Sequence, residues 1–194
     1  MKKILYLMRH GQTLFNARRK IQGNVDSPLT ELGIKQAKRA KQYFIENNIN
    51  ITHAYSSTQE RACDTLEIIT DMPYTRIKGI KEMGFGIFEG ESEDFHPPVL
   101  KYGGIFGEHY ASLGGEGEIS LRKRMVETLT EIMENDSHES VLAVSHGIAC
   151  FTFFSQWHPN IVLEGVPNCT IFKYEYENKK FNNLEIFKPD FSNI

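Results

Sequence analysis

Two short apolar runs in this chain end in the same dipeptide. Residues 4–8 are followed, after one arginine, by a His-Gly pair at 10–11, and residues 141–145 are followed by another at 146–147. Short apolar runs bounded by polar residues are typical of buried strands. A strand that ends in a reactive side chain and a glycine presents that side chain at the carboxyl edge of a parallel sheet. The pattern therefore predicts two buried strands with a histidine at the end of each.

The spacing of apolar residues predicts the other regular elements. Apolar positions three and four residues apart predict helices over 30–47, 58–70 and 121–135, and a short one over 13–20. A strand is expected at 53–56, and alternation over 171–176 and 181–187 predicts a hairpin at a sheet edge, joined by residues 177–180. The buried stripe expected for the helix over 30–47 consists of Leu32, Ala37, Ala40 and Phe44.

The periodicity weakens between residues 83 and 119. This stretch is rich in glycine and contains the Pro97-Pro98 pair, which favours an irregular insertion, about 84–119, with at most one helix. An insertion at this place is positioned as a lid. Its aromatic side chains either line a pocket for a ligand or form a small core of the insertion itself; they are Phe85, Phe88, Phe95, Tyr102, Phe106 and Tyr110.

Composition narrows the class of protein. A chain of 194 residues fits a single domain over 1–194, and 22 basic against 25 acidic residues leave a formal charge of −3. Without a basic stripe or a long apolar segment, neither nucleic acid nor a membrane is expected as a partner. Arg9 and His10 interrupt the first apolar run, so we expect a strand there and not a signal peptide. Three cysteines without metal-ligand spacing favour a reducing cytoplasm.

The first His-Gly pair has the chemistry of an anion site. A neutral imidazole is a competent nucleophile near neutral pH, and His10 has a guanidinium group one residue away in Arg9. That cation repels a metal ion and attracts a phosphoryl group, to which it can donate two hydrogen bonds. Gly11 permits close approach of the backbone, and a helix that begins near Thr13 would add amide donors. No metal site is expected here.

A third predicted strand end carries another cation. Arg61 falls in the first turn of the helix over 58–70, where the helix dipole disfavours a positive charge. A bound phosphate would compensate for this unfavourable position. The remaining five histidines are expected at the surface or in the core; they are His53, His96, His109, His138 and His158.

Five ordered blocks resemble the signatures of the histidine phosphatase superfamily, in the branch of the cofactor-dependent phosphoglycerate mutases and their phosphatase relatives. The blocks are residues 7–13 with Asn16; Gln22-Gly23 with Asp26, 28–30, Gly33 and 36–37; 55–57 with Arg61-Ala62 and Thr65; Glu82 with 85–86 and 89–90; and 144–147. One departure concerns Gly117, because family members often carry serine there. That substitution puts the cap of the following helix in doubt.

The resemblance implies a phosphoglycerate mutase-like α/β fold, with three layers (α/β/α) around a mostly parallel central sheet and an active site at the carboxyl ends of its strands. It also implies that His10 attacks phosphorus to form a phosphohistidine and that Glu82 donates the proton. Arg9, Arg61 and His146 would bind the phosphoryl oxygens. The phosphate pocket would be completed by Asn16, Gln22, Gly23 and Gly147. No cofactor is implied.

The charge of the insertion favours one reaction within the family. Mutases of this branch hold the doubly charged phosphoglycerate with an insertion rich in arginine and lysine, whereas here Lys101 is the single basic residue. The acidic residues between 83 and 121 are Glu89, Glu91, Glu93, Asp94, Glu108, Glu116 and Glu118. We therefore predict a phosphomonoester phosphatase that acts on a small phosphorylated metabolite, with a phosphoglycerate mutase as the alternative. A binding module without catalysis and a metal hydrolase using His10, Glu82 and His146 are the other rivals. The oligomeric state is left open.

Overall fold

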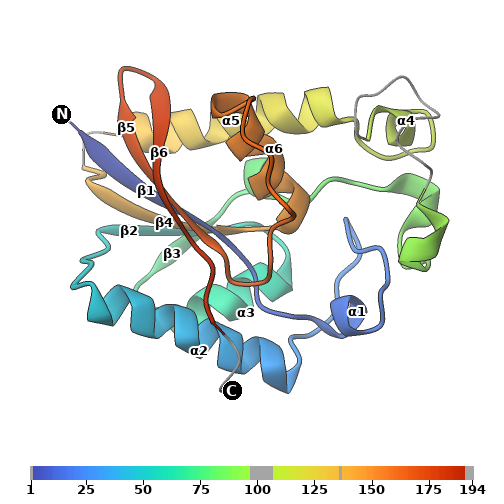
Figure 1. Cartoon of the computed structure of the whole chain (residues 1–194), viewed down its shortest axis with the longest axis horizontal. Helices are drawn as coiled ribbons and strands as arrows, with labels where there is room; N and C mark the ends of the chain where they lie inside the picture. The colour runs from blue at the N-terminus through green and yellow to red at the C-terminus, as the bar shows by residue number, and fades with distance from the viewer. Residues whose placement is uncertain (1, 97–106, 136, 191–194) are drawn as a thin grey trace.

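The computed structural model describes residues 2–96, 107–135 and 137–190. Its centre is a six-stranded sheet in the order β3-β2-β4-β1-β5-β6 (Figure 1). The strands are β1 (Lys3–Arg9), β2 (His53–Ser56), β3 (Tyr74–Arg76), β4 (Ser140–Ser145), β5 (Ile171–Glu177) and β6 (Lys180–Phe187). The first four pair in parallel, and β5 and β6 are antiparallel to their neighbours. The mostly parallel α/β sheet is thus confirmed.

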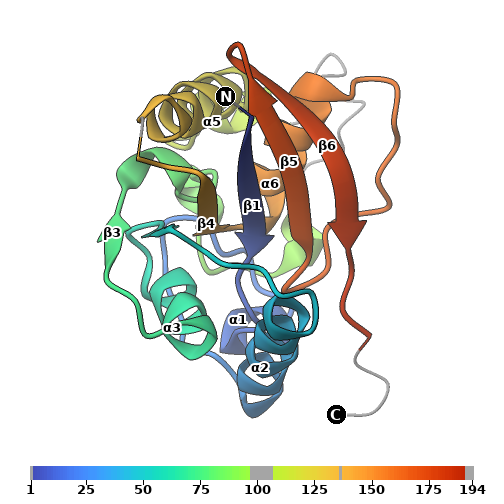
Figure 2. The same ribbon diagram turned by 90° about the vertical axis from the view of Figure 1, so that its left-hand side faces the viewer.

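Helices cover both faces of the sheet (Figure 2). The α-helices are α1 (Leu14–Ala17), α2 (Glu31–Glu46), α3 (Glu60–Ile69), α4 (Glu108–Ala111), α5 (Glu118–Glu134) and α6 (Gly147–Trp157), with 3-10 helices η1 (Lys78–Ile80), η2 (Gly86–Phe88) and η3 (Glu93–Phe95). Alternate side chains of β1 divide the core, because Leu5 and Leu7 pack with α5 and α6, whereas Tyr6 and Met8 pack with α2 and α3. The result is a three-layer arrangement.

The two strands with His-Gly ends are neighbours. β1 and β4 pair in parallel with Arg9 opposite Ser145, so both chains leave the sheet at the same edge. All residues from Leu5 to Met8 and from Val141 to Val144 are buried. Burial on both faces explains why these strands are continuous apolar runs.

Helix α2 shows where the predicted stripe was wrong. Ala37, Ala40 and Phe44 are buried as expected, but Leu32 is 36% exposed. The buried stripe begins at Gly33, and Leu32 lies about 100° away from it around the helix. The side chain of Thr30 caps the helix by accepting a hydrogen bond from the Gly33 amide.

Three other elements differ from the sequence prediction. α1 is a single turn instead of a helix over 13–20, since Arg19 has a positive φ of 50°. Strand β3 was missed because it has three residues. Helix α6 was also missed, and its mostly apolar sequence has no polar face to mark it.

The predicted hairpin is confirmed, with a shorter turn. β5 continues to Glu177 and β6 begins at Lys180, so Asn178 and Lys179 form the connection, both with positive φ. Positive φ at both central residues is characteristic of a tight two-residue hairpin turn. β6 is an edge strand, as expected.

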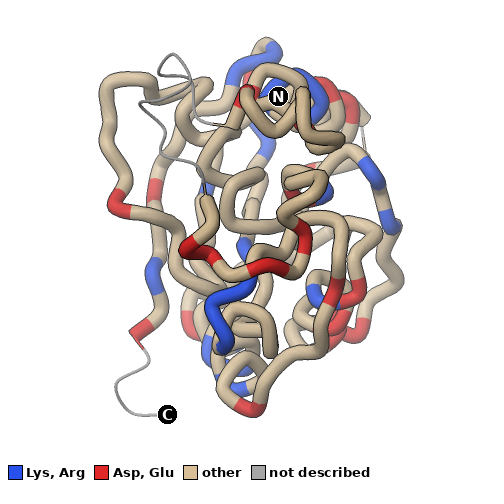
Figure 3. Tube along the Cα trace, turned by 90° about the vertical axis from the view of Figure 1, so that its right-hand side faces the viewer, with Lys and Arg blue, Asp and Glu red and all other residues tan. Residues whose placement is uncertain are grey.

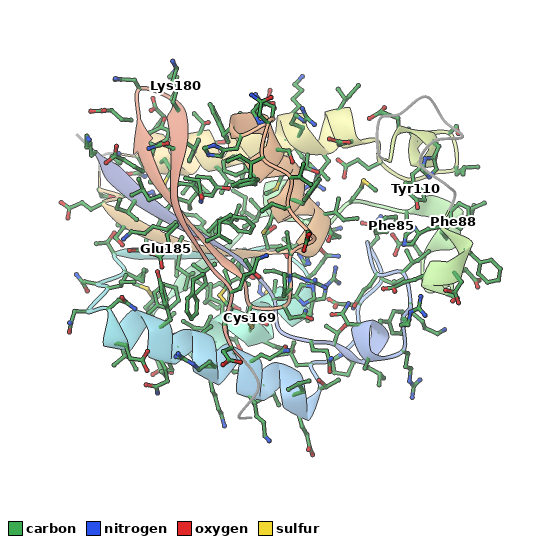
Figure 4. The ribbon with its side chains drawn as sticks, viewed as in Figure 1. Phe85, Phe88, Tyr110, Cys169, Lys180 and Glu185 are labelled. Carbon is green, nitrogen blue, oxygen red and sulfur yellow. The ribbon has the colours of Figure 1, made fainter. Side chains whose placement is uncertain are left out.

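The described part of the insertion forms a small core. Phe85 packs edge-on against Tyr110 at 5.1 Å between ring centroids, and Phe88 packs on the same tyrosine at 5.7 Å (Figure 4). Phe95, by contrast, is 63% exposed. The predictions concerning Pro97, Pro98, Lys101, Tyr102 and Phe106 lie outside the described residues.

The start of α5 bears out the doubt about its cap. Gly117 is the N-cap residue and supplies no side-chain hydrogen bond. Instead, the Glu108 carboxylate accepts a hydrogen bond of 2.7 Å from the Ile119 amide. Among the described helices, none is both long and apolar enough to cross a membrane.

Candidate active site

A cleft of about 440 Å³ lies beyond the carboxyl ends of β1 and β4. Its lining includes six of the predicted site residues: Arg9, His10, Asn16, Gln22, Glu82 and Gly147. Three others do not line it. Of these, Arg61 and His146 lie beside His10, while Gly23 is held in a neighbouring loop.

His10 is held in one orientation by its own backbone. Its Nδ1 lies 2.7 Å from the carbonyl oxygen of Gly11, which can only accept, so Nδ1 carries the proton. Nε2 therefore carries the lone pair of the ring, which accepts a long hydrogen bond of 3.3 Å from Nε of Arg61. Burial lowers the pKa of His10 well below its ordinary value, and the charges of Arg61 and Arg9 lower it further. The imidazole is kept neutral, the form that a nucleophile needs.

Gly11 permits a close approach of the backbone, in this case to the start of α2. A Cβ atom at this position would lie 2.6 Å from the carbonyl oxygen of Gly33. The glycine thus allows the chain after β1 to pass against the start of α2. The first amides of α1 are also engaged, because Leu14 donates to Pro28 and Phe15 donates to Ser27. The amide donors expected from this helix are not free for a ligand.

The positive charge of Arg61 is balanced by groups of the protein itself. Its side chain is fully buried, and NH1 forms an ion pair of 3.0 Å with Asp26. The other terminal N–H groups donate to the carbonyl oxygens of residues 22, 23 and 25. With Nε directed at His10, all five N–H groups have acceptors. The second carboxylate oxygen of Asp26 accepts a hydrogen bond from the Glu60 amide at the start of α3. Asp26 thus supplies the negative charge that the helix dipole favours at this end.

His146 lies beside His10, with 5.1 Å between the ring centroids. Its Nε2 is 2.6 Å from Oγ of Ser57, which already accepts a hydrogen bond from the Gln59 amide. Nε2 is the acceptor for the Ser57 hydroxyl among the described residues, so we assign the hydroxyl as the donor and the ring proton to Nδ1. That Nδ1 is buried and has no partner among the described residues. Burial, followed by the charge of Arg61, lowers the pKa of His146 well below its ordinary value.

Glu82 lines the cleft and accepts hydrogen bonds from the helix that follows His146. Its carboxylate accepts hydrogen bonds of 3.0 and 2.9 Å from the amides of Ile148 and Ala149, in the first turn of α6, and one of 2.9 Å from Met83. An anion at this helix end is stabilised by the dipole. The backbone of Glu82 is held by Arg124, which donates to the carbonyl oxygens of residues 79, 81 and 82.

Arg9 lies against the start of α6. NH1 donates to the Val166 carbonyl at 2.5 Å, and the buried Nε has no hydrogen-bond partner among the described residues. A Cβ at Gly147 would lie 3.3 Å from Nε of Arg9, so glycine there lets the guanidinium group approach the helix. Burial lowers the pKa of Arg9. An unpaired donor beside His10 is suited to an oxygen of a ligand.

The three remaining predicted residues differ in which of their polar groups are left for a ligand. The amide oxygen of Asn16 accepts from the Thr13 amide and from Asn168, which leaves its NH2 group for a ligand. The Gln22 side chain is bound at both ends, to Thr13 and Ser27. The Gly23 amide, which was expected to contribute to the phosphate pocket, donates to the Glu89 carboxylate at 3.1 Å. The same carboxylate also accepts from residues 24, 25 and 85.

Sequence reasoning missed much of the cleft wall. Lys20 and Glu93 line it, and so does His96, which had been assigned to the surface or core. Nδ1 of His96 lies 2.5 Å from the hydroxyl of Tyr110, so only the tertiary contact marks it. The apolar lining residues are Ile21, Phe85, Ile148, Phe151 and Val166. Among the described residues, no group of three or more His, Cys, Asp or Glu side chains is arranged to hold a metal ion.

Known proteins resemble this chain over nearly its whole length. The model of the histidine phosphatase superfamily (branch 1) matches residues 5–188. A probable phosphoglycerate mutase GpmB from Yersinia pestis is 32% identical over 192 residues, which cover 89% of this chain and 85% of that protein. Among solved structures, a phosphoglycerate mutase from Bacillus anthracis has a TM-score of 0.82 at 25% identity, covering 94% of this chain and 91% of the other.

A second solved structure is similar to the same degree. Phosphoserine phosphatase from Entamoeba histolytica, in complex with 3-phosphoglyceric acid, has a TM-score of 0.79 at 25% identity, covering 96% of this chain and 97% of the other. The predicted phosphoglycerate mutase-like fold is thereby confirmed. On the match of the family model and of the relatives, the chain belongs to the histidine phosphatase superfamily, branch 1.

Proposed function

We propose that this protein is a phosphomonoester phosphatase that acts through a phosphohistidine on a small phosphorylated metabolite. The orientation of His10 carries the proposal: Nδ1 is tied to Gly11, and the unprotonated Nε2 is held beside two guanidinium groups at the cleft. Phosphoryl transfer needs a nucleophile in line with the leaving group and donors for the phosphoryl oxygens. Nε of Arg9, Nδ1 of His146 and the NH2 group of Asn16 are suited to be those donors.

The reaction proceeds in two displacements. In the first, Nε2 of His10 forms a bond to phosphorus, the bond from phosphorus to the ester oxygen breaks, and Glu82 gives its proton to the departing alkoxide. In the second, water attacks phosphorus, the bond to Nε2 breaks, and Glu82 takes the proton of the water. The cations that balance the phosphoryl charge are arginines, so the scheme uses no metal ion.

A phosphoglycerate mutase is the second candidate, because the curated relatives are named probable phosphoglycerate mutases. A mutase must hold the glycerate and return the phosphoryl group to it. Among the described residues that line the cleft, Arg9 and Lys20 are the two with lysine or arginine side chains, and Glu93 adds a negative charge. So few cations favour water over a phosphoglycerate as the acceptor.

The two reactions are separated by trapping and by product analysis. We expect acid-labile phosphate on His10 after rapid quenching with p-nitrophenyl phosphate, and inorganic phosphate as the product from 3-phosphoglycerate. Interconversion of 2- and 3-phosphoglycerate that depends on the bisphosphate, without phosphate release, would instead establish the mutase. Absence of any label and of any turnover would refute both.

A further inference from the structure

Glu82 lies in the segment 79–84, which leads from η1 towards η2 and is held by one arginine of α5. One terminal nitrogen of Arg124 donates to the carbonyl oxygens of residues 79 and 81 at 2.9 and 2.8 Å, and the other donates to that of Glu82 at 3.0 Å. The carbonyl of residue 80 accepts from the hydroxyl of Ser145 at 2.8 Å. Each carbonyl from 79 to 82 therefore accepts a hydrogen bond from a side chain of another element, and a single guanidinium group supplies three of the four.

Glu116 fixes the orientation of this guanidinium group. Its two carboxylate oxygens accept hydrogen bonds of 2.7 Å each, from Nε and from a terminal nitrogen of Arg124. Together with the three carbonyl oxygens, the carboxylate provides acceptors for all five N–H groups of the arginine. The backbone of Glu116 is tied to the same segment, because its amide donates to the carbonyl of Gly84 at 2.7 Å. A bidentate pair of this kind sets both the position and the plane of the guanidinium group.

The segment 79–84 also packs directly against α5. A Cβ atom at Gly79 would overlap the side chain of Thr128, which lies one turn after Arg124 on that helix. The missing side chain at this position lets the backbone come within reach of the guanidinium group. Packing and hydrogen bonding therefore join the segment to α5 at the same place.

Arg124 holds this segment without belonging to the cleft. Of the two residues, only Glu82 is among the described residues that line the cleft, whereas both line a second cavity of about 410 Å³. The charge of Arg124 is balanced by its ion pair with Glu116. Acidic and basic positions are interspersed on the side of the molecule that carries α4 (Figure 3). The contact through which Arg124 reaches the cleft is therefore the backbone of Glu82.

We propose that Arg124, oriented by Glu116, is a positioning residue for Glu82, and that proton transfer to the leaving group depends on it. The Glu82 carboxylate is bound to α6, at the amides of Ile148 and Ala149, while Arg124 anchors its backbone to α5. The two anchors fix the carboxyl group between the helices. A misplacement of about 1 Å can cost about a hundredfold in rate. The inference rests on the proposed phosphatase function, with Glu82 as its proton donor.

Two substrates of similar shape separate the positioning of Glu82 from a general loss of structure. Benzyl phosphate releases an alkoxide, which needs a proton, whereas p-nitrophenyl phosphate releases a phenolate that leaves without one. Arg124→Gln is expected to lower kcat for benzyl phosphate about tenfold to thirtyfold with KM nearly unchanged, and kcat for p-nitrophenyl phosphate by less than about threefold. A structural defect would lower the active fraction of the enzyme, and with it both rates by one factor.

Three matched variants separate the geometry of the arginine from its charge. Arg124→Lys keeps the positive charge, which adds to burial in lowering the pKa of His146, but loses the planar set of donors, so we expect the same selective loss. Glu116→Gln keeps the arginine and breaks the bidentate pair, with a selective loss of about threefold to fivefold expected. Arg122→Gln is the control, because its ion pair is with Glu118 of the same helix. It should keep both rates of the wild type.

Combination with Glu82→Gln measures whether the two residues act together. If Arg124 acts through Glu82, Arg124→Gln has no further effect on benzyl phosphate once Glu82 is replaced. Losses that multiply, equal losses for the two substrates, full activity of Arg124→Lys, or a wild type that hydrolyses only p-nitrophenyl phosphate would refute the positioning role and leave the phosphatase standing. If the wild type hydrolyses neither phosphate, the proposed function fails and the positioning role fails with it.

Discussion

The ends of β1 and β4 are alike in sequence and different in surroundings. Each strand is buried, and each leads into a histidine followed by glycine at the same edge of the sheet. After β1 the backbone turns back on the ring, so that the Gly11 carbonyl binds Nδ1 of His10 and leaves Nε2 unprotonated. After β4 the helix α6 begins at once, and His146 is its N-cap residue. Nε2 of His146 forms a hydrogen bond with the hydroxyl of Ser57.

The same His-Gly motif therefore presents two different chemical groups, depending on its surroundings. Both rings carry the proton on Nδ1, but the protein engages that N–H in His10 and the opposite nitrogen in His146, so His10 presents a lone pair and His146 presents an N–H group. Glu82 accepts a hydrogen bond from the helix that follows His146, whereas Arg61 donates a hydrogen bond to His10. Accordingly, the end of β1 is suited to nucleophilic attack, and the end of β4 to binding of oxygen and to proton transfer.

The comparison is tested most severely by removing each histidine. His10→Ala is expected to lower kcat/KM for p-nitrophenyl phosphate by at least about a thousandfold, since no other group provides the lone pair at that place. His146→Ala removes one donor and is expected to cost about tenfold to a hundredfold. Steady-state kinetics on variants with unchanged circular dichroism measures both. Equal losses would contradict the assignment of different roles.

Glu82→Gln tests proton donation at the end of β4. For alkyl phosphates we expect kcat/KM to fall about a hundredfold, because an alkoxide needs a proton in order to leave. For p-nitrophenyl phosphate the loss should be much smaller, since the phenolate leaves without one. Glu91→Gln, at an exposed position, serves as the control. The same loss for both substrates would indicate that Glu82 only caps α6.

Arg61→Ala tests the cation of α3 that lies beside His10. All five N–H groups of Arg61 have acceptors in the protein, so Arg61 acts on a bound phosphate through its buried charge, and phosphate and vanadate should inhibit less well without it. The charge of Arg61 lowers the pKa of His10, so its removal raises that pKa. The acid limb of kcat/KM should therefore move to higher pH. An acid limb that stays at the same pH in a variant whose folding is intact by urea titration would contradict an effect of Arg61 on the pKa of His10.

The two ends share one property, which affects stability. Burial lowers the pKa of both His10 and His146 in the folded protein, so the unfolded chain binds more protons below its ordinary histidine pKa of about 6.5. Stability is then fully present above that pH and decreases as the pH falls below it, by at most about 1.4 kcal/mol per pH unit for each histidine. Urea unfolding from pH 7.5 to 5 measures the slope. His146→Gln should make it shallower, and an unchanged slope would contradict a neutral, buried His146.

Much of the fold follows from local sequence. The runs over 4–8 and 141–144 are apolar because both faces of their strands are buried, and that requirement is visible without the structure. Thr30 and the spacing of Ala37 and Ala40 likewise predict α2. Helix α6 escaped detection because the same requirement, burial on most sides, removes the polar face that marks a helix.

The sequence by itself determined which chemical groups meet at the edge of the sheet. Each of Arg9, His10, Arg61, Glu82 and His146 stands beside a predicted strand end or in a recognisable block. Their meeting follows from a parallel sheet, whose strands deliver their carboxyl ends to a common place. For that reason the residues of the site, and the family to which the chain belongs, were accessible from the pattern alone.

Only the tertiary structure decided how those groups are engaged. Arg61 forms an ion pair with Asp26, the Gly23 amide donates to Glu89, and the paired segments at 19–20 and 92–93 bring Lys20 opposite Ser92. These contacts join residues far apart in the chain, and a residue type does not specify which partner its hydrogen bonds will find. The physical reason is that hydrogen bonds and charges act over a few ångströms in space, while the sequence records only order along the chain.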